Sequence, residues 1–112
     1  MRVLRGYFFM NQKKVLKFVR KEVEQRQAFL DVGLTLASLA SRIDSNRTYV
    51  SHALMTLGGF NTYIGRCRLA HFTEYRQLHP NATVAEAVLA SGFRSRQSYY
   101  NLLKSLNGAS LE

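Results

Sequence analysis

The chain has 112 residues, of which 46% are hydrophobic, and its 16 Lys and Arg residues against seven Asp and Glu residues give a formal net charge of +9. This length suits one domain, or two small subdomains that share a helix, and the basic balance suits a polyanionic partner. Few runs alternate between apolar and polar residues, which argues against β-structure, and the longest apolar run near the start, residues 7–10, is far too short to span a membrane. We therefore expect an all-α fold.

A basic segment precedes the first predicted helix. Residues 1–10 are basic and aromatic without clear periodicity, and we interpret them as a lead-in for which disorder is an open reading. Asn11 is a good capping residue, and the apolar residues after it fall near one face of a helix that ends at Asp31 and Gly33: Val15, Phe18, Val19, Val23, Phe29 and Leu30. This helix is interpreted as the outer wall of the fold, with a dimer surface, an interdomain surface and a clamp on the DNA backbone as alternatives.

Residues 36–57 then show a short apolar helix, a tight turn and a second, amphipathic helix. Thr35 is expected to cap the helix 36–42, and Asn46 the helix 47–57. Asp44 in the turn can adopt the left-handed conformation at modest cost. Gly58 and Gly59 end the second helix, with a left-handed residue expected at one of them.

A longer connecting helix follows, with Asn61 as its expected cap, and Pro80 prevents its continuation beyond about Leu78. Its apolar residues cover more than one narrow stripe, so we expect it to be buried on two sides. Residues 84–106 then repeat the earlier pattern with a turn that is one residue longer: Thr83 and Glu86 form a capping box, Ser95 caps the second helix of the pair, and Asn107-Gly108 closes that helix.

The expected organisation is therefore a sequence of five segments. They are a lead-in (1–10), an N-terminal helix with a first helix-turn-helix subdomain (11–59), a connecting helix (60–79), a second helix-turn-helix subdomain (80–108) and a tail (109–112) in which Leu111-Glu112 is interpreted as a cloning scar, so that the chain is expected to be part of a longer protein.

The outward faces of the second helices carry the functional prediction. An α-helix enters the major groove when its outer face is polar and its inner face is held by another helix. Arg96 suits guanine, Gln97 or Asn101 suits adenine, and Thr48 suits a thymine methyl group. Phosphate contacts are expected close to the helix N-termini, where backbone donors and the helix dipole favour an anion, and from basic residues of both helices: Ser45, Asn46, Arg47, Ser95, Ser98 and Lys104.

As a linked set, these motifs resemble the DNA-binding domain of AraC-type transcription regulators over about residues 29–108. The first helix pair is similar to the family's first helix-turn-helix through Leu39-Ala40, Ile43 and residues 46–51. The second pair is similar to the family signature through Gly92-Phe93, residues 95–100 and Leu103-Lys104. The connecting helix is similar through residues 60–64, Arg66, Arg68 and Leu69.

The resemblance implies two helix-turn-helix subdomains bridged by a long helix, with recognition helices in major-groove segments about 34 Å apart on one face of the DNA. The family's base-reading positions fall on Thr48, Ser51, His52, Arg96, Gln97, Tyr100 and Asn101. We expect the second helix to read bases more directly, whereas the small Thr48 and Ser51 leave the first more dependent on phosphate and DNA shape. Tyr100 is open between base or sugar contact and partial burial beside Tyr99.

The partners implied by the resemblance are double-stranded DNA and RNA polymerase, since family members commonly activate transcription by touching the polymerase. They usually carry a separate sensing or dimerisation domain, and none is visible in this sequence. No cofactor and no small-molecule ligand are expected for this fragment. The expected location is the cytoplasm, on DNA, within a parent protein for which a membrane anchor is not excluded.

Other chemistry finds little support in the sequence. Cys67 is the single cysteine, which excludes an internal disulfide. The three histidines have no metal-ligand spacing with it, and no nucleophile elbow or phosphate loop is present, so we expect neither a metal site nor an enzyme. Arg66 and Arg68 are open between DNA-backbone contact, solvation and a salt bridge to Glu74 or Glu86.

Two alternative functions remain at this level. The first is a basic helical protein-interaction module that binds DNA only nonspecifically. The second is a membrane-proximal fragment in which Arg2, Arg5 and residues 7–10 touch anionic lipid.

Overall fold

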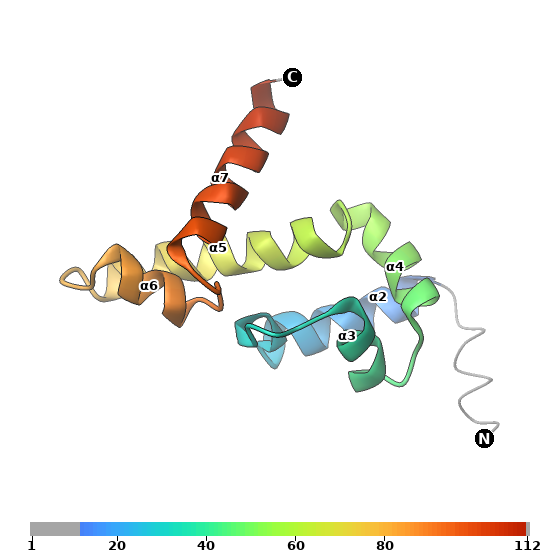
Figure 1. Cartoon of the computed structure of the whole chain (residues 1–112). Coiled ribbons are helices and arrows are strands. Elements are labelled where there is room, and N and C mark those ends of the chain that lie inside the picture. The colour runs from blue at the N-terminus through green and yellow to red at the C-terminus, as the bar shows by residue number, and fades with distance from the viewer. Residues whose placement is uncertain (1–11, 112) are drawn as a thin grey trace.

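A computed structural model describes residues 12–111 of the chain, with the side chains of residues 12–107 (Figure 1). The lead-in predicted for residues 1–10 and the cap predicted at Asn11 lie outside these residues. The described part is helical without a strand, which confirms the all-α prediction. Its elements are α2 (Gln12–Arg20), η1 (Lys21–Gln25), η2 (Ala28–Leu30), α3 (Leu36–Arg42), α4 (Arg47–Leu54), η3 (Met55–Leu57), α5 (Phe60–Leu78), α6 (Val84–Ala90) and α7 (Arg96–Leu111).

The N-terminal helix is shorter than the sequence predicts. After α2 the chain forms a π-helical turn, η1, in which the amide of Arg26 donates to the carbonyl of Lys21 at 3.0 Å, and Gln27 then takes a left-handed conformation with φ 61°. The spacing of the buried valines explains the π turn. Val15, Val19 and Val23 are four residues apart, and a wider turn advances each residue by a smaller angle, which keeps Val23 on the buried face.

The first hydrophobic core lies between α2, η2, α3, α4 and the beginning of α5. Thr35 forms a capping box with Ser38, and Asn46 caps α4 by accepting from the amide of Tyr49 at 2.9 Å. Asp44 has φ 55°, the left-handed conformation expected of it. The buried members of this core are Val15, Val19, Val23, Ala28, Phe29, Leu34, Leu39, Ala40, Val50, Ala53, Leu54, Tyr63 and Ile64.

We call the elements around the first core the first half of the molecule, and those around a second core, described below, the second half. Helix α5 runs through both halves, as its two-sided apolar pattern predicts. Tyr63 and Ile64 belong to the first core, whereas Phe72 belongs to a second core. The cap predicted at Asn61 is wrong. The chain enters the helix directly from Gly59, which makes no side-chain capping bond, and α5 begins at Phe60, so Asn61 already lies within the first turn.

The second core is smaller and lies between α5, α6 and α7. Its buried members are Phe72, Ala87, Val88 and Phe93. The capping box of Thr83 and Glu86 forms with bonds of 2.9 and 3.1 Å, and Ser95 accepts from the amide of Ser98 at 3.2 Å. The loop before α7 (residues 91–95) is one residue longer than the loop before α4 (residues 43–46), as predicted.

Helix α7 does not end at Asn107-Gly108 but continues to Leu111. A glycine inside a helix lowers the stability of that helix by about 1 kcal/mol relative to alanine. This loss weakens a helix without ending it, and residues 109–112 include no proline. The predicted tail of residues 109–112 is therefore helical as far as residue 111.

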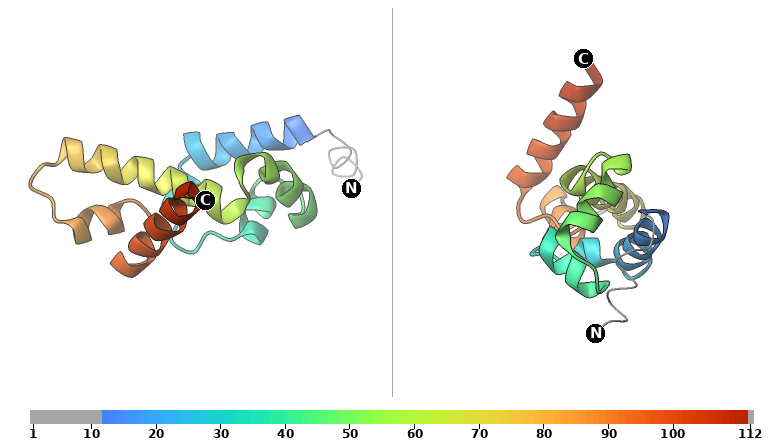
Figure 2. Two further views of the ribbon diagram at one scale, coloured as in Figure 1. Left: turned by 90° about the horizontal axis from the view of Figure 1, so that it is seen from above. Right: turned by 90° about the vertical axis from the view of Figure 1, so that its right-hand side faces the viewer.

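The molecule is elongated, with principal extents of 51 × 32 × 19 Å. Helices α2, α3 and α4 gather at one end, α6 and the start of α7 lie at the other, and α5 joins them, while the rest of α7 projects from the body (Figures 1 and 2). No helix within residues 12–111 is long and apolar enough to cross a membrane.

Candidate nucleic-acid interface

Helix α4 has one buried and one polar face. Val50, Ala53 and Leu54 are at most 1% exposed, because α2 and α3 pack against them. The opposite face carries the predicted base-reading residues of the first helix. Arg47, Thr48 and His52 are exposed, and Ser51 is half-buried.

These polar side chains border an open hollow of about 440 Å³. Arg47, Thr48, Ser51 and His52 line it from α4, and residues 35–37 line it from the beginning of α3. The start of α3 was not singled out from the sequence. In the sequence these residues carry no charge, and only the predicted cap at Thr35 marks this helix start.

Helix α7 shows the same division of faces. Tyr99 and Leu102 are half-buried against the second core, and Leu103 is half-buried as well. The predicted reading residues are exposed: Arg96, Gln97, Tyr100 and Asn101, followed by Lys104. The two helices thus present their polar residues on faces that their cores leave open.

Gln97 and Asn101 are joined on this exposed face. The Nε2 of Gln97 donates to the Oδ1 of Asn101 at 2.8 Å, one helical turn further on. This bond uses one of the two amide hydrogens of Gln97 and leaves its Oε1 and a second hydrogen free of that bond. An acceptor and a donor on one amide are what the major-groove edge of adenine requires.

Tyr100 stands at the outer end of an aromatic column. Its ring centroid lies 5.0 Å from that of Tyr99, which in turn lies 4.4 Å from Phe72 and 5.5 Å from Phe93. With 50% of its surface exposed, Tyr100 leans on the core and keeps a free face. The partial burial beside Tyr99 is therefore observed, whereas contact with a base or sugar stays a prediction.

The residues predicted to contact phosphate differ in exposure and in hydrogen bonding. Arg47 and Lys104 are exposed, while Asn46, Ser95 and Ser98 use side-chain or backbone atoms in helix capping. Ser45 does not fit the role. Its hydroxyl oxygen is buried and has no hydrogen-bond partner among the described residues, and its amide donates to the carbonyl of Ala40 at 2.9 Å.

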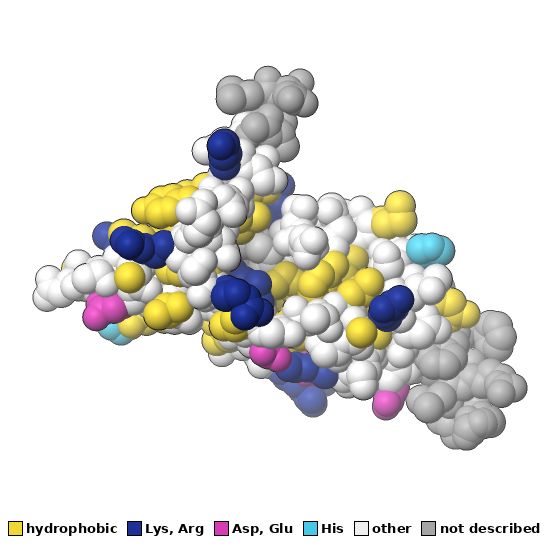
Figure 3. Space-filling model, in the orientation of Figure 1, with side chains coloured by type: hydrophobic (Ala, Val, Ile, Leu, Met, Phe, Trp, Pro, Cys, Tyr) yellow, Lys and Arg dark blue, Asp and Glu magenta, His cyan; other side chains and the backbone are white. Residues whose placement is uncertain are grey.

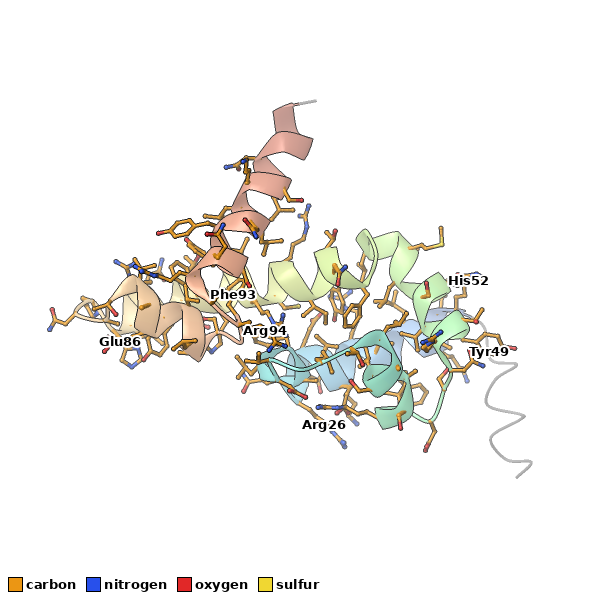
Figure 4. All side chains as sticks on the ribbon, in the orientation of Figure 1. Arg26, Tyr49, His52, Glu86, Phe93 and Arg94 are labelled. Carbon is orange, nitrogen blue, oxygen red and sulfur yellow. The ribbon has the colours of Figure 1, made fainter. Side chains whose placement is uncertain are left out.

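Arg94 is a basic residue that the sequence reasoning passed over. It is exposed in the turn between α6 and α7 (Figure 4), and this turn lies directly against η2 of the first half. Its place beside the cap of α7 was the available signal. Figure 3 shows Lys and Arg side chains spread over the visible face from α7 to α4 rather than gathered in one patch.

Arg68 is half-buried and forms neither of the predicted salt bridges, whereas DNA-backbone contact stays a prediction. Its Nε donates to the carbonyl of Phe29 at 2.7 Å, and its Nη2 donates to the carbonyl of Asp31 at 2.9 Å. Burial lowers the pKa of the Arg68 guanidinium, against the opposing effect of the Asp31 carboxylate. The Glu86 carboxylate is instead occupied in its capping box.

The basic N-terminal helix forms one wall of the first core, with Val15 and Val19 buried against the other helices. Glu24, in the π turn η1 that follows this helix, links it to α5. Its carboxylate accepts from the Tyr63 hydroxyl at 2.7 Å and pairs with Arg20 at 3.1 Å. The dimer, interdomain and DNA-clamp alternatives concern its outer face and stay predictions.

No family model, curated protein or solved structure matches this chain. The functional assignment therefore depends on the chemistry of the exposed faces. Within the described residues, no group of three or more His, Cys, Asp and Glu side chains is placed to hold a metal ion. Cys67 is half-buried, and burial raises the pKa of its thiol to about 11.

Proposed function

We propose that the protein binds double-stranded DNA sequence-specifically and regulates transcription, with α4 and α7 as its two recognition helices. The observation that carries this proposal is the shared division of faces. Each helix is held from behind by its own core, and both cores include residues of the same helix, α5. Two polar helix faces on one support suit a duplex, which offers its major groove again after each helical turn.

The two helices contribute differently in this proposal. On α7, Arg96 is proposed to read guanine, and the hydrogen-bonded pair of Gln97 and Asn101 is proposed to read adenine. On α4, the small Thr48 and Ser51 beside Arg47 line a hollow that suits the sugar-phosphate backbone and the shape of the groove. The net charge of +9 supplies the nonspecific part of the affinity.

We further propose that this is an AraC-type DNA-binding domain with RNA polymerase as a second partner. The support is the linked set of sequence motifs, together with the helix order, the turn lengths and the capping residues, which agree with a doubled helix-turn-helix. The cytoplasm, where duplex DNA and polymerase are available, is the corresponding location.

Selection of binding sites from a pool of randomised duplexes tests the proposal. We expect one preferred sequence, and Arg96→Ala should relax the preference at a single base pair, with a loss of about 1–3 kcal/mol of discrimination. Lys104→Ala is the matched control on the same helix, because a phosphate contact should weaken all duplexes alike and lower the salt slope by about 1. Equal enrichment of every sequence would refute sequence-specific binding.

The same titrations decide about the alternative of a basic protein-interaction module. Nonspecific binding is almost wholly electrostatic, so a module of that kind would bind the selected and the scrambled duplex equally at low and at moderate salt. A sequence-specific domain would retain its preference as salt rises.

A further inference from the structure

Arg68 and His71, one turn apart on α5, lie where the first half of the molecule meets the second. Arg68 binds the carbonyls of Phe29 and Asp31 in the first half. The ring of His71 meets the ring of Phe29 edge-on with centroids 5.7 Å apart, and its Nδ1 lies 2.9 Å from the Oγ of Ser91 in the second half. We call these residues, together with Gly92, the junction.

Gly92 closes the junction from the second half. The residue has φ 88°, and a Cβ atom built on it would lie 2.5 Å from the carbonyl oxygen of Phe29 and 3.1 Å from the Nε of Arg68. The carbonyl of Phe29 thus receives the guanidinium of α5 on one side and the backbone of the turn before α7 on the other. The segment that places α7 therefore rests directly on the segment that leads to α3.

The surroundings make this contact a firm one. Ser91 is fully buried, Phe93 is 4% exposed and Phe29 is 6% exposed. A buried carbonyl that loses its donor is destabilising, and an arginine held by two carbonyls has a fixed plane. Helix α5 contributes to both cores, and the junction adds a direct contact between segments on either side of it.

We propose that Arg68 is a positioning residue that fixes the orientation of α7 relative to α4, and so makes DNA binding depend on the spacing between the two half-sites. The effect on DNA rests on the proposed function, whereas the effect on orientation concerns the free protein. Arg68 itself contacts no base in this proposal, because its guanidinium is bound to the carbonyls of Phe29 and Asp31.

Distance measurements in the free protein test the orientation. Spin labels are attached at Thr56→Cys and Ser105→Cys, both exposed positions, in a Cys67→Ala background, and their separation is measured by double electron-electron resonance. We expect a narrow distribution in the parent protein and a broader one after Arg68→Met. Arg66→Met is the matched control, because it removes an exposed arginine from the same helix and should leave the distribution narrow.

Spacing-shifted duplexes test the consequence for DNA. Inserting two base pairs between the selected half-sites should weaken binding of the parent protein by about tenfold, and that of Arg68→Met by less than about threefold. A distribution for Arg68→Met as narrow as the parent's, or an unchanged spacing penalty, would overturn the role of Arg68. If the parent protein selects no sequence, the proposed function fails, while the distance measurement still decides about the junction.

A more conservative substitution replaces Arg68→Met if that variant does not fold. If thermal unfolding shows that Arg68→Met is not folded, Arg68→Lys carries the test, because lysine keeps the charge and cannot reach both carbonyls in one plane. We then expect the distance distribution of Arg68→Lys to be broader than that of the parent protein. A distribution as narrow as the parent's would count against the proposal.

Discussion

Gly92→Ala is the substitution for which the structure gives the clearest magnitude. The φ of 88° lies in the left-handed region, where a Cβ atom costs roughly 1–2 kcal/mol. The new methyl group would also lie 2.5 Å from the carbonyl oxygen of Phe29, and both groups belong to backbone that cannot rotate away. Relief requires the turn to move off η2, a repacking that costs about 1–3 kcal/mol. The expected loss of unfolding free energy is the sum, about 2–5 kcal/mol.

Gly58→Ala separates the two contributions. Gly58 has the same φ of 88°, and its added Cβ would meet mainly the Thr62 side chain, at 3.0 Å. It should therefore cost about 1–2 kcal/mol, nearly all of it from the backbone conformation. Urea unfolding followed by far-UV circular dichroism, with equal m-values for all variants, measures the difference. If Gly92→Ala is no more destabilising than Gly58→Ala, the close packing of the turn on Phe29 is wrong.

Three further predictions concern charge, base readout and pH. Arg94→Ala should weaken binding to selected and scrambled duplexes alike and lower the salt slope by about 1, as titrations over a salt series would reveal. Asn101→Ala should release the Gln97 amide and reduce discrimination chiefly at the base pair that Gln97 reads, which binding to duplexes substituted at each position would locate. Stability should fall as pH rises from about 9 toward 11, because the unfolded thiol of Cys67 ionises first and burial raises its folded pKa to about 11. Cys67→Ala should flatten this decline in urea unfolding at each pH.

Local signals in the sequence predicted most of the helix boundaries. Thr35, Asn46, Thr83 and Ser95 all act as caps, because a cap and the amide that it accepts from are only three residues apart. The prediction failed at Asn61, where two glycines had already turned the chain into the helix.

Contacts between distant segments were beyond the sequence. Apolar periodicity indicates which face of a helix is buried, but it does not identify the neighbour that covers it. The bonds from Arg68 to Phe29 and from Tyr63 to Glu24 each join residues 39 positions apart, and neither was predicted. The burial of the Ser45 hydroxyl belongs to the same class, since it depends on how the turn packs rather than on its composition.

The N-terminal helix determines where a fragment that contains the first polar helix face can begin. Val15, Val19 and Val23 are at most 2% exposed, and α2 packs directly on α4. Burial of three valines contributes about 5 kcal/mol of hydrophobic stabilisation before the entropy of ordering the segment is subtracted. A fragment starting at residue 29, where the family resemblance begins, would keep both polar helix faces and lose the wall that holds the first of them. We therefore expect the smallest unit that folds to be larger than the unit that a motif search would outline.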